Sequence, residues 1–168
     1  MRKNEFASMI VESVHDVFLA FLFMEAKAGP VVTKPEEEIY NPPNAEATAV
    51  VNFSGGIHGG VHLASPRHVA LKLAGALAGE EFQEITDREA GDGFGELGNM
   101  VAGGLQTKLG ERFGVINLTP PTIISGNDYR MQYKSNFNSV KQYFLSDAGP
   151  FFVEFFFFID GYDPEREE

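Results

Sequence analysis

The clearest chemical feature of this sequence is an acid and an amide one helical turn apart. The pattern predicts a long helix over residues 87–113, and one narrow stripe of it holds residues at i, i+4, i+7 and i+11, namely Asp92, Glu96, Asn99 and Gly103. A carboxamide can donate one hydrogen bond while accepting another, so Asn99 can hold an attacking water in line with a phosphorus. Glu96 can pair with a partner's lysine and fix the register of docking. We therefore expect this pair to enter a partner's cleft, with the partner supplying the metal and the phosphoryl group.

The same helix is rich in glycine, and each interior glycine costs roughly 1 kcal/mol relative to alanine. Small residues form a second stripe beside the polar one, namely Gly91, Gly95, Gly98 and Ala102. Because small residues let another backbone approach closely, we expect a second helix of the domain or a partner protein to pack there. A third, apolar set is expected to face the core, namely Phe94, Leu97, Val101 and Leu105.

Other helices and a set of strands must position this stripe. A first helix is predicted over residues 4–27 and is expected to end at Gly29-Pro30, and another is predicted from Ser65-Pro66 to about Gly79. Apolar runs between turn residues predict strands at 31–40, 45–54, 57–65, 115–118, 122–125, 129–135, 140–145 and 151–160. This order predicts an α+β fold in which long helices cover a mostly antiparallel sheet.

The last predicted strand, FFVEFFFFID at residues 151–160, is apolar on both faces. Such a strand must be covered on both sides, by helices of its own chain or by a second subunit. We expect a homodimer for this reason.

Composition narrows the class of protein. The net charge of −11 means that the surface repels nucleic-acid backbones and anionic lipid, so neither is an expected partner. The chain has no cysteine, and the pair His58 and His62 lacks a third ligand, so no metal site is predicted. Acidic residues before the apolar run 17–24 argue against a secretory signal, and no apolar run reaches the length that spans a bilayer. We expect one cytoplasmic domain over residues 1–168, with 163–168 as an acidic tail.

The polar stripe resembles a family signature. The pattern Asp/Ser-x-x-x-Glu-x-x-Asn, followed about twenty residues later by proline, is typical of the CheC/CheX/FliY chemotaxis phosphatases. In this chain the matching residues are Asp92, Glu96, Asn99 and Pro120-Pro121. The segments GGIHGGVHLASPRHVALKLAGALAGEE and LTPPTIISG are similar to the family's elements before and after the active helix. The resemblance covers roughly residues 5–160 and implies a CheC-like fold, closest to members with a single intact motif such as CheX.

The resemblance also implies roles for the motif residues. In that family the asparagine orients the hydrolytic water and the glutamate forms a salt bridge with the active-site lysine of CheY. These roles fall on Asn99 and Glu96, with Asp92 as a supporting member of the motif. The implied substrate is the aspartyl-phosphate of a CheY-like response regulator, whose receiver domain is expected to supply Mg²⁺. No cofactor of the chain's own is expected.

The first predicted helix offers a degenerate copy of the motif. Ser8, Glu12 and His15 have the same spacing as the three motif residues of the long helix, which predicts a pseudo-twofold internal repeat. His15 stands where the family pattern has asparagine. An imidazole can position a water, but we expect this first copy to be inactive.

Blander interpretations remain for these residues. A polar stripe on a helix is ordinarily a solvated face without function. A non-catalytic module that binds a response regulator, such as the related middle domain of the switch protein FliM, would share the fold but lack the motif. A small-ligand sensor on the same fold is a weaker alternative, because the sequence shows no pocket signature.

Overall fold

The computed structural model describes residues 3–34, 45–127 and 137–158. The helices are α1 (Lys3–Val17), which continues into the π-helical turn η1 (Phe18–Leu22), α2 (Arg67–Ala78) and α3 (Arg88–Phe113). The strands are β1 (Ala26–Lys34), β2 (Ala47–Gly55), β3 (His58–Ser65), β4 (Ile116–Leu118), β5 (Thr122–Ser125), β6 (Asn138–Ser146) and β7 (Gly149–Phe158). The predicted strand at 129–135 and the predicted tail at 163–168 lie outside the described residues.

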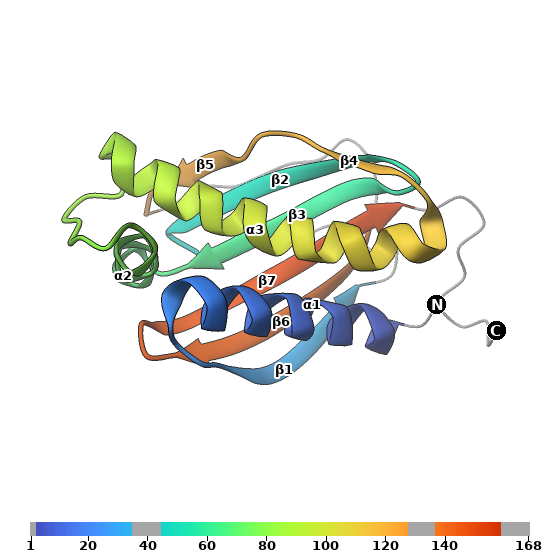
Figure 1. The fold of residues 1–168 in the computed structure, drawn as a ribbon, viewed down its shortest axis with the longest axis horizontal. Helices are drawn as coiled ribbons and strands as arrows, with labels where there is room; N and C mark the ends of the chain where they lie inside the picture. Colours follow the sequence, from blue (N-terminus) through green and yellow to red (C-terminus); the bar gives the residue numbers. More distant parts are fainter. Residues whose placement is uncertain (1–2, 35–44, 128–136, 159–168) are drawn as a thin grey trace.

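The described strands form one antiparallel sheet in the order β1-β6-β7-β3-β2-β4, and β5 also pairs with β2. Figure 1 shows α1, α2 and α3 together on one face of this sheet. Apolar residues from α1 and α3 and from alternate positions of the strands make up the core between the two layers. The predicted α+β fold, a mostly antiparallel sheet covered by long helices, is therefore confirmed. The internal repeat stays a prediction.

The phenylalanine-rich strand β7 lies in the middle of the sheet, between β6 and β3. Its residues 151–157 are all buried. On the helix face, the ring of Phe155 lies 5.4 Å from that of Phe6 in α1. On the opposite face, the ring of Phe156 lies 4.5 Å from that of His62 in β3. Both faces of β7 are thus buried within one chain, so this strand does not need a second subunit to cover it.

The first helix ends earlier than the sequence predicted. Helical structure stops at Leu22, where the next residue, Phe23, adopts a left-handed backbone with φ of 53°. β1 begins at Ala26, so Gly29 and Pro30 lie inside a strand and do not end a helix. The register between β1 and β6 shifts at these two residues. Proline is tolerated here because β1 is an edge strand of the described sheet, where a bulge and a missing ladder donor cost little.

Within the described residues, no helix is long and apolar enough to cross a membrane.

Candidate active site

The two faces of α3 have opposite character. The apolar residues that were predicted to face the core are all buried, namely Phe94, Leu97, Val101 and Leu105. On the outer face, Asp92 and Glu96 are exposed and Asn99 is half-buried. The helix therefore packs on the sheet through its apolar side and presents the polar stripe away from it.

The small-residue stripe of α3 contacts the chain's own sheet, which corrects the expectation of a second helix or a partner protein. A Cβ atom on Gly98 would lie 2.9 Å from the Cβ atom of Ala49 in β2. A Cβ atom on Gly95 would lie 3.3 Å from Pro121, which follows β4. Both glycines let the helix lie so close to the sheet and to Pro121 that a side chain at either position would require its neighbours to shift. Because Gly95 precedes Glu96, the Pro121 contact also sets the position of the polar stripe.

A contact with α1 also holds α3 in place. The hydroxyl of Ser13 donates a buried hydrogen bond of 2.8 Å to the main-chain oxygen of Val101. Gly104 leaves room for this contact, because a Cβ atom there would meet the Ser13 hydroxyl. Sequence reasoning missed Ser13, although a small polar residue within the apolar face of the first helix was a usable signal. The contact restricts rotation of α3 and thereby fixes the direction of its outer stripe.

The polar stripe makes few contacts within the chain. Among the described residues, neither Glu96 nor Asn99 forms a hydrogen bond or an ion pair. Asp92 lies 3.9 Å from Arg88 one turn earlier, and both side chains are exposed. The acid and the amide are thus available to an incoming molecule, whereas Asp92 has a neighbour on its own helix.

The corresponding residues of α1 are engaged by the chain itself. The Ser8 hydroxyl donates to a main-chain oxygen one turn earlier at 3.1 Å. The Glu12 carboxylate lies 3.2 Å from the ammonium group of Lys108 in α3. Nε2 of His15 lies 2.7 Å from the main-chain oxygen of Ala26, a geometry in which the imidazole donates. These contacts agree with the expectation that the first copy is inactive, which stays a prediction.

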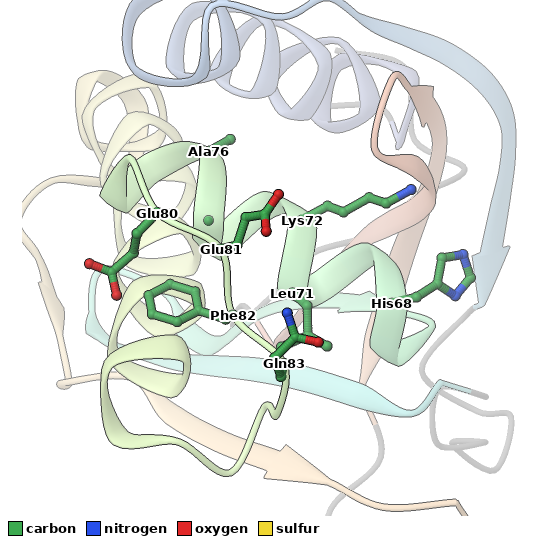
Figure 2. Close-up of a pocket in the computed structure, with 9 residues that line it drawn as sticks. His68, Leu71, Lys72, Ala76, Glu80, Glu81, Phe82 and Gln83 are labelled. Atoms are coloured by element: carbon green, nitrogen blue, oxygen red, sulfur yellow. The ribbon is translucent and has the colours of Figure 1, made fainter.

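The motif residues of α3 line none of the pockets found among the described residues. The groove drawn in Figure 2, of about 510 Å³, lies between α2 and the segment that leads to α3. His68, Leu71, Lys72 and Ala76 line it from α2, and Glu80, Glu81, Phe82 and Gln83 from the segment. A hydrogen bond with Glu89, together with the charge of that carboxylate, raises the pKa of Glu80. None of the motif residues borders this groove.

The two histidines of β3 have different environments. His58 is exposed, whereas His62 is fully buried with Nδ1 3.5 Å from a carboxylate oxygen of Glu154 in β7. Burial lowers the pKa of His62, although Glu154 opposes that shift. Among the described residues, no three His, Cys, Asp or Glu side chains gather where a metal ion could be held.

Comparison with known proteins identifies the family. The family model described as chemotaxis phosphatase CheX matches residues 47–145. The CheY-P phosphatase CheX of Thermotoga maritima is 33% identical over 123 residues, which is 73% of this chain and 77% of that protein. This chain belongs to the CheX family. The matched region contains Asp92, Glu96 and Asn99 of α3 and does not contain α1.

Solved structures of CheX proteins have the same fold. CheX from Desulfovibrio desulfuricans has a TM-score of 0.77 and 21% identity, over 92% of this chain and 99% of that one. CheX from Borrelia burgdorferi, solved in a complex with CheY, BeF₃ and Mg²⁺, has a TM-score of 0.72 and 21% identity, over 90% and 97% of the two chains. At these identities the likeness establishes the fold.

Proposed function

We infer that this CheX-family protein hydrolyses the aspartyl-phosphate of a CheY-like response regulator. The observation that carries this proposal is the pair Glu96 and Asn99, which occurs in the family's motif order on the outer face of α3. Both side chains lack partners among the described residues, so they are free to enter a receiver's active-site cleft. The similarity to a CheY-P phosphatase supports the same substrate class.

Asn99 is proposed to position the attacking water. Its amide can accept a hydrogen bond from the water at its oxygen and donate another through its nitrogen, which fixes the direction of the water's lone pair. The water oxygen then forms a bond to phosphorus as the bond between phosphorus and the aspartyl oxygen breaks, which yields inorganic phosphate and a free carboxylate. Half-burial of Asn99 restricts its rotamers before docking and so reduces the ordering cost in the complex.

Glu96 is proposed to dock the receiver. A carboxylate one turn from the amide can form a charge-assisted hydrogen bond with the receiver's active-site lysine. That contact sets the depth and register at which α3 enters the cleft. Mg²⁺ bound by the receiver would neutralise charge on the phosphoryl group.

A homodimer is part of the proposal, with a different structural basis from the one that the sequence suggested. β1 pairs only with β6 among the described strands, and its side chains Val31 and Val32 are 42% and 52% exposed. An edge strand with exposed apolar residues is suited to pair with a second copy. Light scattering of the purified protein that shows only monomer would contradict this part of the proposal. A cytoplasmic location is proposed because the substrate is a response regulator.

The function is tested by adding the purified protein to a phosphorylated receiver domain with Mg²⁺ and following phosphate release. The proposal expects faster release with the wild-type protein and loss of that acceleration in Asn99→Ala. Binding of the receiver without any acceleration would favour the non-catalytic module over the phosphatase.

A further inference from the structure

Gly103 of α3 has no packing contact among the described residues that requires glycine, a property that it shares with Gly110 further along the helix. Among the described residues, nothing lies within 4 Å of the position that a Cβ atom on Gly103 would take. Glycine in a helix interior is less favourable than alanine. A glycine that no contact requires therefore lowers the stability of the helix, and no described contact compensates for that loss.

Neighbouring glycines of α3 differ in this respect. Gly95 faces Pro121, Gly98 faces Ala49, and Gly104 faces Ser13, each too close for a side chain to fit without a shift. Their absence of a side chain is required by contacts with the sheet or with α1. No such contact accounts for Gly103, which is four residues after Asn99 on the outer stripe.

A side chain at position 103 would lie over the proposed site. Side chains of an α-helix tilt toward its N-terminus and cover the preceding turn. The turn before Gly103 is the one that carries Asn99. A methyl group at position 103 would therefore take up part of the space beside the Asn99 amide, and a longer side chain would take up more of it.

The degenerate copy of the motif in α1 is followed by a large side chain at the corresponding position. Four residues after His15 stands Leu19, in the π-helical turn, and its side chain is 60% exposed. The stripe whose polar groups are engaged by the chain is thus followed by a large apolar residue. The stripe whose polar groups are free is followed by glycine.

We propose that Gly103 is a positioning residue for the phosphatase reaction. It keeps the C-terminal side of the Asn99 amide open, so that a main-chain segment of the receiver next to the phosphorylated aspartate can lie against α3. The inference rests on the proposed function, because the partner is the phosphorylated receiver. Gly103 does not itself touch the reacting atoms and acts by leaving Asn99 accessible.

The experiment compares Gly103→Leu with Gly110→Leu. Gly110 is a matched control, because it is also an interior glycine of α3 with nothing described within 4 Å of its Cβ position. It lies on the same side of the helix, about 16 Å beyond Asn99 by the rise per residue. Both substitutions replace glycine by a good helix former, so thermal unfolding should move to higher temperature in both variants.

Steady-state phosphate release is measured at several concentrations of the phosphorylated receiver. For Gly103→Leu we expect kcat/KM to fall at least about tenfold, mainly through a higher KM, a loss of the size seen at a single interface hot spot. Gly103→Ala should show a smaller fall in the same direction. Gly110→Leu should stay within about twofold of wild type, as is usual for surface substitutions.

A lower kcat/KM together with a higher unfolding temperature in Gly103→Leu would support the positioning role, because a purely structural role would lower both quantities. Wild-type kcat/KM in a folded Gly103→Leu variant overturns the inference while leaving the proposed function intact, and so does an equal fall in Gly110→Leu. A wild-type protein that neither accelerates phosphate release nor binds the receiver activated with beryllofluoride contradicts the proposed function itself, and the inference with it.

Discussion

α1 and α3 lie on the same face of the sheet (Figure 1) and carry polar residues at the same spacing, yet these residues have different contacts in the two helices. In α1 the imidazole of His15 and the carboxylate of Glu12 are bound to other parts of the chain. In α3 the side chains of Glu96 and Asn99 have no partner among the described residues. Spacing places polar groups on a common face. Their availability decides whether they can act on another molecule.

The largest expected effect is the difference in the rate of receiver dephosphorylation between substitutions of Asn99 and of His15. Asn99→Ala should lower the rate of receiver dephosphorylation at least about 100-fold, because removal of a single positioned hydrogen-bonding group has costs of that size. His15→Ala should leave the rate unchanged and lower the free energy of unfolding by about 1 kcal/mol, since the bond to the Ala26 oxygen is lost. Phosphate release and urea unfolding of both variants measure these effects. The reverse result, in which His15→Ala loses the acceleration and Asn99→Ala keeps it, would mean that the active residues lie on α1.

The next largest effect is the expected difference in receiver affinity between substitutions of Glu96 and of Glu12. Glu96→Gln should weaken binding of the activated receiver about tenfold or more, because the lysine ammonium then pairs with a neutral amide oxygen in place of a carboxylate. Glu12→Gln should leave receiver affinity unchanged, since that carboxylate pairs with Lys108 of the same chain. Calorimetric titration with the beryllofluoride form of the receiver gives both affinities. Equal losses in the two variants would show that overall charge, and not docking at α3, governs binding.

The contact between α1 and α3 should itself be measurable as a coupling. Gly104→Ala is expected to cost about 1–3 kcal/mol of stability, because the added methyl group would collide with Ser13. Ser13→Ala should cost about 1 kcal/mol through the lost bond to the Val101 oxygen. The double variant should lose less than the sum of the two, because removal of the hydroxyl relieves the collision. Strict additivity in denaturant unfolding would contradict the direct contact.

The smallest effect is expected at Asp92. Its carboxylate is exposed and 3.9 Å from Arg88, a separation at which an exposed ion pair contributes little. Asp92→Ala should therefore change kcat/KM for the phosphorylated receiver by no more than about threefold, the scale of an ordinary surface substitution. A loss as large as that of Glu96→Gln would make Asp92 a third docking residue.

Local periodicity predicted much of this molecule. The core-facing set of α3 and its outer polar stripe follow from 100° spacing alone, and the strand at 122–125 was predicted with its observed bounds. The predicted end of the first helix was wrong, because the turn at Phe23 comes before the Gly29-Pro30 pair that was expected to end the helix. Proline and glycine at that point instead accommodate an irregularity of the edge strand.

Contacts between distant segments could not be predicted in the same way. The small-residue stripe of α3 was correctly recognised as a close-approach surface, but its contact with Ala49 and Pro121 depends on how the sheet is ordered. The apolar pattern of β7 was equally compatible with coverage by the chain's own helices and by a second subunit, and only the order of the sheet shows that it is a central strand. The engagement of His15 by Ala26 also required the structure, since it depends on where β1 begins.

Direct contact of Asn99 with the receiver is best measured by NMR of the side-chain amide signals of Asn99, which are assigned through their absence in Asn99→Ala. The receiver is added with Mg²⁺ and beryllofluoride, and the imidazole signals of His15 are followed in the same titration. We expect the Asn99 amide signals to shift or broaden as the complex forms, while those of His15 stay in place. Formation of the complex with the Asn99 amide signals unmoved would contradict this expectation.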